Sequence, residues 1–135
     1  MTKLYLPLLA LICYGATAFA AEPVTYQLST HILDINTGKP ASDVTIRLEK
    51  QQDQQWITLA QSKTDANGRV GNFLPQTSNN FGIYKLIFET GEYFAAQKQQ
   101  SIYPYVEVVF QIKENTHYHI PITLSANGYS TYRGN

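Results

Sequence analysis

Cysteine is almost absent from the sequence. The one cysteine in 135 residues, Cys13, lies in an apolar stretch near the start of the chain. Because a disulfide needs two cysteines, no disulfide within one chain can hold the fold together, and a hydrophobic core has to do so. A domain of this size buries roughly two thirds of the surface that its unfolded chain exposes, which is enough for one core.

Concentrated charge is also lacking. Ten lysines and arginines balance ten aspartates and glutamates, and no block of basic residues occurs. Because sequence-independent binding to nucleic acid depends on clustered positive charge, no nucleic-acid partner is expected.

The sequence has no Gly-x-Ser-x-Gly elbow and no glycine-rich phosphate loop. Both absences disfavour a serine enzyme of the α/β-hydrolase type and a nucleotide-binding site.

Long apolar runs are limited to one, near the N-terminus. The chain starts with a positive charge, residues 4–16 are almost entirely apolar, and Ala18 and Ala20 are small residues two positions apart. This order is typical of a secretory signal peptide. We therefore expect residues 1–20 to be cleaved and residues 21–135 to fold as one domain, periplasmic or secreted and free of the membrane. The apolar run is shorter than the about 20 residues that span a bilayer, so a retained anchor is the weaker alternative.

Alternating apolar and polar residues recur in short segments separated by turn signals. Such segments predict half-buried strands, and they occur at residues 26–33, 44–49, 56–60, 83–89, 106–112 and 117–125. Residues 34–40 and the pair Asn67-Gly68 predict turns, and residues 51–55 predict a hairpin loop. Regular short strands of this kind predict an all-β fold, a β-sandwich of two sheets.

One short helix and one interrupted strand complete the predicted fold. Thr90 is suited to cap a helix within residues 91–100. The inner side of this helix is expected to carry Tyr93, Phe94 and Gln97. Pro121 lies within the last predicted strand. Because proline has no N–H to donate, it indicates either an edge position or an unpaired stretch near a site.

The chain contains three histidines, all on the more polar faces of predicted strands: His31, His117 and His119. His117 and His119 are two residues apart, so an extended strand directs both to the same side. Three imidazoles can bind zinc and leave one position open for water, although no cysteine ligand or helical ligand motif accompanies them. The alternative is metal-free chemistry, in which a neutral imidazole takes a proton from water.

A base of this kind needs a cation or hydrogen-bond donors that stabilise the developing oxyanion. Arg47 alternates with buried residues and is expected to project to solvent. Arg69 follows the Asn67-Gly68 turn, from which its side chain can reach over the end of a sheet, although a solvated turn residue is the simpler interpretation. Arg133 lies in a C-terminal segment that also carries two tyrosines. This tail is either disordered or ordered against a partner or a cleft.

Several of these motifs together resemble one family. Its first strand and turn look like Leu28-Ser-Thr-His-Ile-Leu-Asp34, and its functional arginine ends a turn similar to Thr64-Asp-Ala-Asn-Gly-Arg69. Its C-terminal signature resembles His117-Tyr-His-Ile-Pro121 together with Tyr129-Ser-Thr-Tyr-Arg-Gly134. The family is that of the transthyretin-like 5-hydroxyisourate hydrolases, and the resemblance runs in order over essentially all of residues 21–135.

The resemblance implies a transthyretin-type β-sandwich of Greek-key-like connectivity, assembled as a homotetramer with active sites between subunits and without metal or cofactor. It implies hydrolysis of a small molecule, 5-hydroxyisourate, to 2-oxo-4-hydroxy-4-carboxy-5-ureidoimidazoline. The family's catalytic positions match His31, Arg69 and His119, and its less critical histidine matches His117. The substrate-binding positions of its tail match Tyr132, Arg133 and Asn135. Asn135 stands where the family usually has serine.

The resemblance also implies a mechanism. His31 or His119, whichever acts as the base, activates a water that attacks a ring carbonyl, and Arg69 stabilises the negative charge. Thyroid-hormone-carrying transthyretins have similar strands but lack these histidines and the Tyr-Arg-Gly end, so the polar residues favour an enzyme. The alternatives are a periplasmic carrier of a small ligand and a histidine-ligated zinc protein.

Overall fold

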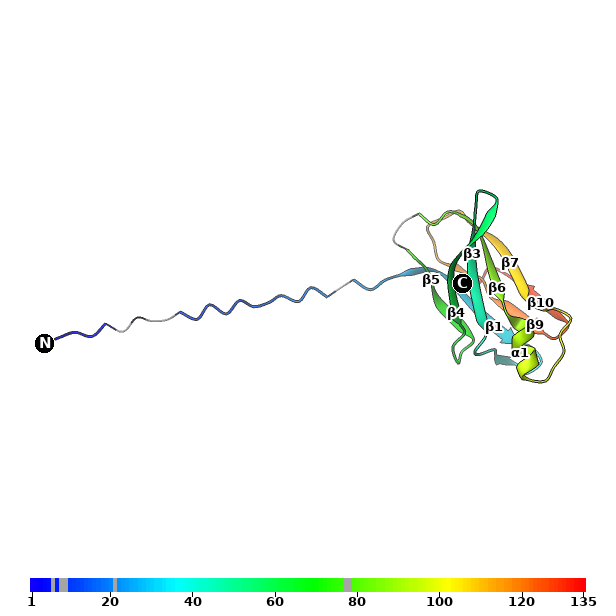
Figure 1. Ribbon diagram of the computed structural model, residues 1–135, viewed down its shortest axis with the longest axis horizontal. Coiled ribbons are helices and arrows are strands. Elements are labelled where there is room, and N and C mark those ends of the chain that lie inside the picture. Colours follow the sequence, from blue (N-terminus) through cyan, green and yellow to red (C-terminus); the bar gives the residue numbers. More distant parts are fainter. Residues whose placement is uncertain (6, 8–9, 21, 77–78) are drawn as a thin grey trace.

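The alternating segments of the sequence form strands in the computed structural model, which describes residues 1–135 except 6, 8, 9, 21, 77 and 78. The first sheet contains β1 (Tyr26–Asp34), β2 (Lys39–Pro40), β5 (Arg69–Pro75), β8 (Tyr118–His119), β9 (Ile122–Ser125) and β10 (Gly128–Thr131). The second sheet contains β3 (Thr45–Gln52), β4 (Gln55–Lys63), β6 (Gly82–Phe88) and β7 (Val106–Ile112). The helix α1 (Thr90–Ala96) follows β6, and the two sheets pack as layers (Figure 1). The predicted all-β sandwich with one short helix is confirmed.

Strand β1 is the centre of the first sheet. It pairs antiparallel with β5 and β2 and parallel with β8 and β9, and β10 lies beyond β9. The second sheet has the order β4-β3-β6-β7 and is antiparallel throughout. Side chains on one face of β1 therefore have neighbours from β5 on one side and from β8 on the other.

The core lies between the sheets. Leu28 and Ile32 of β1 meet Ile46 and Leu48 of β3 there, and all four side chains are fully buried. Burial of such side chains contributes about 1.5–3 kcal/mol each. Because side chains alternate along a strand, burying Leu28 and Ile32 directs Ser29 and His31 to the outer face.

Two predictions about the helix are wrong. Thr90 does not cap α1 but lies inside its first turn, fully buried, and Glu89 occupies the N-cap position without a side-chain cap bond. Because β6 runs almost directly into the helix, Thr90 is enclosed by the core, whereas Glu92 in the same turn is exposed. Phe94 is fully buried and Tyr93 packs against the core as predicted, whereas Gln97 is exposed.

The last predicted strand is broken in two. β8 ends at His119 and β9 begins at Ile122, with Pro121 in the gap. β9 lies between β1 and β10, so Pro121 marks an unpaired stretch inside the sheet and not an edge. Pro121 itself is buried and its carbonyl accepts a hydrogen bond of 2.9 Å from the Thr131 hydroxyl. The hydroxyl of Thr131 therefore links β10 to this break.

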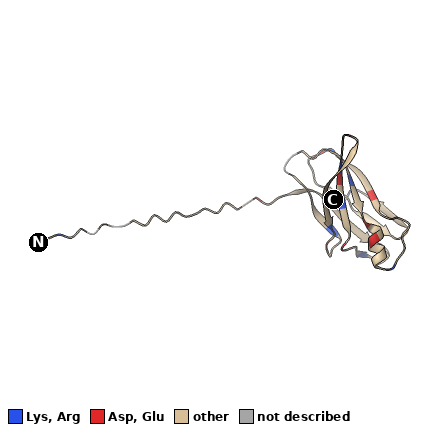
Figure 2. Ribbon diagram, viewed as in Figure 1, with Lys and Arg blue, Asp and Glu red and all other residues tan. Residues whose placement is uncertain are grey.

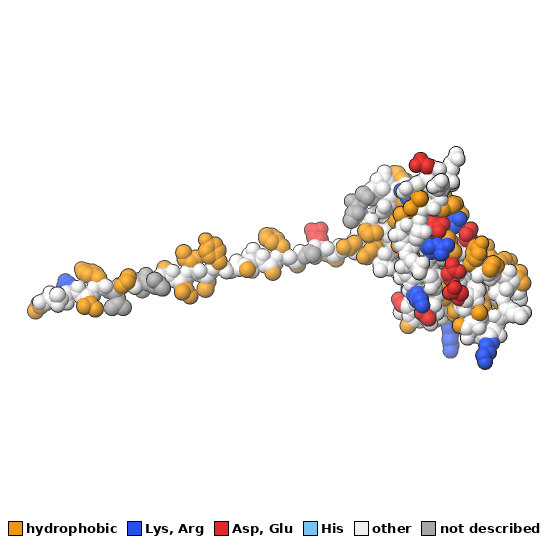
Figure 3. Space-filling view, viewed as in Figure 1, with side chains coloured by type: hydrophobic (Ala, Val, Ile, Leu, Met, Phe, Trp, Pro, Cys, Tyr) orange, Lys and Arg blue, Asp and Glu red, His pale blue; other side chains and the backbone are white. Residues whose placement is uncertain are grey.

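The described residues before β1 run in an extended course away from the sandwich, and apolar side chains occur along them (Figures 1 and 3). Four residues of the predicted signal and cleavage region lie outside the described residues: Leu6, Leu8, Leu9 and Ala21. In the part of the chain that the structure describes, no helix is both long and apolar enough to cross a membrane.

Candidate active site

His31 and Arg69 stand opposite each other in the ladder between β1 and β5. Opposed residues of an antiparallel pair project to the same face, with Cβ atoms about 4.5–5.5 Å apart. The outer face of β1 therefore presents an imidazole next to a guanidinium. This pairing bears on the question that the sequence left open for Arg69, because it places the residue beside His31 and not only after a turn.

The turn before β5 sets the position of Arg69. Asp65 Oδ1 accepts hydrogen bonds from the backbone N–H groups of Asn67 at 2.8 Å and of Arg69 at 3.0 Å. Gly68 has a φ of +71°, and a Cβ there would lie 2.7 Å from the carbonyl oxygen of Ile32. Glycine is needed both for the left-handed backbone and for this close approach. The predicted turn is confirmed, although it joins strands of different sheets.

His119 reaches the same face from the other side of β1. β8 pairs parallel with β1, and His119 stands opposite Ser29. The Ser29 hydroxyl lies 2.7 Å from Nδ1 of His119 and 2.8 Å from Nε2 of His117. Both histidines therefore point to the same side, as predicted. His119 is 9 % exposed, whereas His117 is exposed.

The C-terminal tail packs against His119. The backbone N–H of Gly134 donates a hydrogen bond of 2.8 Å to the carbonyl oxygen of His119. A Cβ on Gly134 would lie 2.5 Å from Cδ2 of the imidazole, so the glycine backbone covers that edge of the ring. The guanidinium of Arg133 lies 4.2 Å from the centre of the Tyr118 ring. Tyr132, Arg133 and Asn135 are all exposed. Among the described side-chain hydrogen bonds, only Arg133 of these three forms one, to the Thr116 hydroxyl at 3.3 Å.

Burial and the neighbouring positive charge of Arg69 lower the pKa of both His31 and His119. Burial lowers the pKa of His119, and the Arg69 guanidinium and the other two histidines lower it further, while the backbone of Ser29 acts in the opposite direction. Burial and then Arg69 also lower the pKa of His31, against the effects of the Asn67 backbone and the Asp65 carboxylate. A neutral imidazole is the form that can accept a proton. His31, Arg69 and His119 thus lie on one face of the first sheet, and they are hereafter called the histidine–arginine cluster.

Two other candidates from the sequence find no support in this arrangement: Arg47 as the stabilising cation, and a metal ion held by the histidines. Arg47 forms ion pairs with Glu49 at 3.0 Å and with Glu89 at 3.5 Å, in the second sheet. Within the described residues, no group of three or more histidine, cysteine, aspartate or glutamate side chains is placed to hold a metal ion. His117 and His119 instead share a hydroxyl group. Acidic and basic residues are interspersed over the strands visible in Figure 2.

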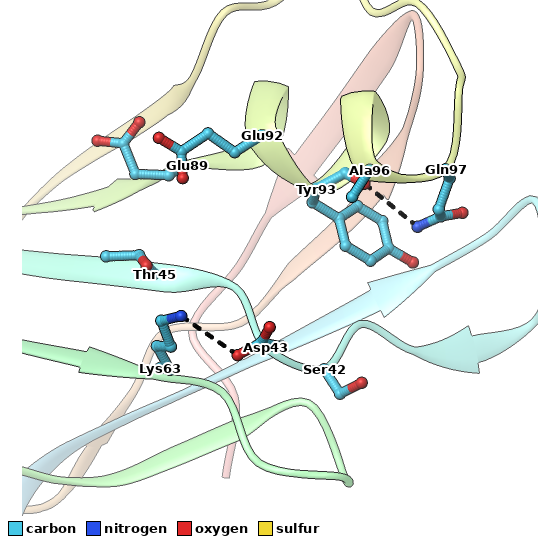
Figure 4. Close-up of a pocket in the computed structure, with 9 residues that line it drawn as sticks. All are labelled: Ser42, Asp43, Thr45, Lys63, Glu89, Glu92, Tyr93, Ala96 and Gln97. Atoms are coloured by element: carbon cyan, nitrogen blue, oxygen red, sulfur yellow. Dashed lines mark hydrogen bonds and ion pairs between the residues drawn. The ribbon is translucent and has the colours of Figure 1, made fainter.

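A pocket of about 360 Å3 lies between α1 and the start of β3 (Figure 4). Its walls are mostly polar, and Lys63 and Asp43 form an ion pair of 3.4 Å across its rim. The lining residues are Ser42, Asp43, Thr45, Lys63, Glu89, Glu92, Tyr93, Ala96 and Gln97. None of them belongs to the histidine–arginine cluster, which lies on the outer face of the first sheet.

Comparison with known proteins agrees with this geometry. The model of the HIUase/Transthyretin family matches residues 28–134. The chain belongs to this family. The matched range begins at the strand that carries His31 and ends at Gly134, so it contains the whole histidine–arginine cluster.

Family members of two kinds resemble the chain. The 5-hydroxyisourate hydrolase of Salmonella typhi is 44% identical over 121 residues, which is 89% of each chain. The structure of Klebsiella pneumoniae 5-hydroxyisourate hydrolase has a TM-score of 0.70 and 40% identity, covering 80% of this chain and 98% of that one. Transthyretin from Sparus aurata has a TM-score of 0.75 but 28% identity, covering 80% of this chain and 96% of that one.

The transthyretin fold is therefore shared by the hydrolases and the transthyretins, whereas sequence identity is higher to the hydrolases. The transthyretin-type sandwich expected from the sequence motifs is confirmed. The chain is an enzyme, a hydrolase of this family. Ser29, which lies beside the cluster and contacts His117 and His119, was not assigned by the sequence reasoning, although it stands on the same strand face as His31.

Proposed function

We propose that the protein hydrolyses 5-hydroxyisourate at the histidine–arginine cluster. The observation that carries the proposal is the convergence of His31 and Arg69 across the β1–β5 ladder with His119 from β8. The names of the hydrolases that resemble the chain support the choice of substrate. The proposed product is 2-oxo-4-hydroxy-4-carboxy-5-ureidoimidazoline, whose carboxyl group comes from the attacked ring carbonyl.

The proposed reaction needs one base and one cation. A neutral imidazole takes a proton from water as the water oxygen adds to a ring carbonyl carbon. Arg69 stabilises the negative charge on the carbonyl oxygen. The ring C–N bond then breaks, the nitrogen leaves with a proton, and the new carboxyl group ionises. General-base catalysis contributes typically about 10²–10⁴-fold to a rate, and no metal is required.

Tyr132, Arg133 and Asn135 complete the proposed site. Gly134 packs on the His119 ring, so the residues on either side of it lie at the edge of the cluster. Tyr132 is 58% exposed in the single chain, which suits a side chain that contacts substrate or a second subunit. We place the active site in a cleft between subunits of a homotetramer, in keeping with a cluster that lies on a sheet surface.

The proposed location is the periplasm or the cell exterior. The order of charged, apolar and small residues in positions 1–20 supports export. The extended course of the segment before β1 is compatible with removal of these residues, because none of the described strands begins before Tyr26.

A carrier of a small ligand without turnover is the second candidate. The likeness to a transthyretin, with a TM-score of 0.75, favours it. The two lowered histidine pKa values favour the enzyme, because a carrier of a small ligand does not need a base.

An absorbance time course with freshly prepared 5-hydroxyisourate tests the proposal, with and without a chelator. Turnover faster than spontaneous decay and unaffected by the chelator is expected. Binding without acceleration would support the carrier. Loss of turnover on chelation would support a metal-dependent reaction.

A further inference from the structure

Ser29 has no role in the chemistry described so far, yet its hydroxyl group lies between two histidines. Its Oγ is 2.8 Å from Nε2 of His117 and 2.7 Å from Nδ1 of His119. A hydroxyl group shared by two imidazoles constrains where each of them holds its proton, because every hydrogen bond needs one donor and one acceptor.

The series of hydrogen bonds starts at a group that can only accept. Nδ1 of His117 lies 3.0 Å from the backbone carbonyl oxygen of Tyr26. Since a carbonyl oxygen carries no proton, Nδ1 of His117 must carry one and donate it. A neutral imidazole has a single N–H, so Nε2 of neutral His117 is an acceptor. It therefore accepts its hydrogen bond from the Ser29 hydroxyl.

The same count determines the state of His119. A serine hydroxyl has one proton, and Ser29 uses it in the hydrogen bond that it donates to His117. In its second hydrogen bond Ser29 Oγ can only accept, so Nδ1 of His119 is the donor. Neutral His119 then has its lone pair on Nε2. The Cδ2 edge of the ring lies against Gly134 and Nδ1 lies against Ser29, which leaves Nε2 for the substrate side.

We propose that Ser29 is a positioning residue that holds His119 in the tautomer with an unprotonated Nε2, and that Nε2 of His119 is the proton acceptor of the reaction. The relay runs from the Tyr26 carbonyl through His117 and Ser29 to His119. Its part in catalysis rests on the proposed function, whereas the tautomer is a property of the folded protein alone.

A fixed tautomer benefits a base in two ways. The nitrogen that carries the proton is determined by the hydrogen bond that the other nitrogen makes or lacks, so no fraction of the neutral enzyme presents an N–H where a lone pair is required. When Nε2 takes a proton from water, Nδ1–H still donates to Ser29 Oγ. The imidazolium therefore forms without any rearrangement of its partner. The same relay gives exposed His117 a supporting role rather than a direct one.

The tautomer can be measured without any variant. In a ¹⁵N spectrum of the histidine side chains, protonated and unprotonated ring nitrogens have separate chemical shifts. At a pH where His117 and His119 are both neutral, we expect a protonated Nδ1 and an unprotonated Nε2 in each of the two rings. A His119 with its proton on Nε2 would overturn the proposal.

Three variants then test the effect on catalysis. Ser29→Ala removes the hydroxyl, and we expect kcat to fall at least about tenfold with KM changed less than about threefold, as for a group that acts on the base and not on the substrate. Ser29→Thr keeps the hydroxyl on a strand that tolerates β-branching, and it should recover most of kcat. Ser125→Ala is the matched control, because it removes a serine hydroxyl bonded to the Gly128 carbonyl in the same sheet.

The outcomes separate the two proposals. Full kcat in Ser29→Ala, or a reduced kcat with the His119 tautomer unchanged, would overturn the positioning role. A loss in Ser29→Ala that Ser29→Thr does not restore would point to packing instead. If the wild-type protein does not turn over 5-hydroxyisourate, the proposed function fails and the catalytic role of Ser29 fails with it. The spectrum still decides the tautomer in that case.

Discussion

His119 is the residue on which the contacts of the site converge. Its Nδ1 shares a hydrogen bond with Ser29, its Cδ2 is covered by Gly134, and burial and the positive charge of Arg69 lower its pKa. His31, whose pKa is also lowered by burial and by Arg69, is influenced by the Asn67 backbone and the Asp65 carboxylate, but it is only partly buried. The sequence left open which of the two is the base, and the enclosure of His119 favours this residue.

Substitution of the cluster should reduce turnover without unfolding the protein. His119→Ala and Arg69→Ala should each lower kcat/KM at least about tenfold, as expected when a base or an oxyanion-stabilising cation is lost. His117→Ala should have a smaller effect, because His117 acts through Ser29. The rates are measured with fresh 5-hydroxyisourate and folding is checked by circular dichroism.

Arg47→Ala is a matched control for Arg69→Ala. Arg47 is also an arginine on a strand, but its ion pairs with Glu49 and Glu89 are partly exposed and contribute about 0–1 kcal/mol to stability. Its removal should leave turnover unchanged. If His117→Ala proves more damaging than His119→Ala, the assignment of His119 as the base is wrong.

The acid limb of the pH profile should lie below the ordinary histidine value of about 6.5. The base works only while neutral, and burial followed by Arg69 lowers the pKa of His119, so the ring stays neutral to a lower pH than a free imidazole. Activity is therefore retained at pH 6.5 and lost as the pH falls through the lowered pKa. A kcat/KM profile measured from pH 4.5 to 8 should show this limb, and a rate independent of pH over that range would remove histidine as the base.

At the scale of the elements, the C-terminal tail and β8 meet at one backbone hydrogen bond, from Gly134 to His119. Gly134→Ala would place a Cβ 2.5 Å from Cδ2 of His119 and 3.4 Å from Cγ. Either the tail or the imidazole has to move, so kcat should fall several-fold while the core is untouched. The loss of stability should stay within about 1–3 kcal/mol, the usual range for overpacking, measured by thermal unfolding.

Gly128→Ala is the control for this substitution. Gly128 lies in β10, six residues before Gly134. The nearest atom to a Cβ added there is Ser125 Oγ at 3.7 Å, an ordinary contact distance. It should keep wild-type turnover. Equal kcat in Gly134→Ala and wild type would show that the position of the tail against His119 does not matter to the reaction.

The elements that could be predicted from the sequence are those with one buried face. β3 and β7 alternate regularly, β1 and β6 less so, and all four form close to the predicted bounds. β5 was not predicted because its apolar residues, Val70, Phe73 and Leu74, do not alternate, and its pairing with β1 contains a register shift. β10 is short and polar, and it is fixed by pairing with β9 rather than by burial.

The site could be predicted only in part for a related reason. The residue types and the common direction of His117 and His119 follow from the sequence, because strand alternation is a local rule. That β5 and β8 flank the same stretch of β1 depends on long-range pairing, which periodicity does not determine. The motif resemblance supplied His31, Arg69 and His119 as a set. It did not supply Ser29, whose role depends on distances between side chains.

At the scale of the whole molecule, the sandwich keeps its core and its site apart. The core between the sheets is closed by apolar residues from both layers, whereas the histidine–arginine cluster lies outside it on the first sheet. Substitutions in the cluster can therefore change activity with little effect on stability. The same geometry leaves one wall of the proposed cleft to be supplied from elsewhere, and in a closed homo-oligomer that wall is a symmetry-related copy of the same surface.

Deletion of residues 132–135 tests this arrangement at the scale of the assembly. The deletion ends the chain after β10 and removes the hydrogen bond from Gly134 to His119 and the contact of Arg133 with Tyr118. These two contacts are worth about 1–3 kcal/mol together, less than the about 5–15 kcal/mol that stabilises a typical domain. The truncated protein should therefore fold, with a lower melting temperature.

Its turnover should nevertheless fall by a large factor, because the deletion uncovers the His119 ring and removes Tyr132, the exposed aromatic residue two positions before Gly134. Asn135→Ser, which keeps a small polar side chain at this position of the proposed site, should keep both activity and assembly. Light scattering after size-exclusion chromatography reports the oligomeric state of the three proteins, and we expect the wild type and Asn135→Ser to be tetramers. A truncated protein that hydrolyses 5-hydroxyisourate at the full rate would remove Tyr132 from the site, and the reaction would then have to rest on His31, Arg69 and His119 alone.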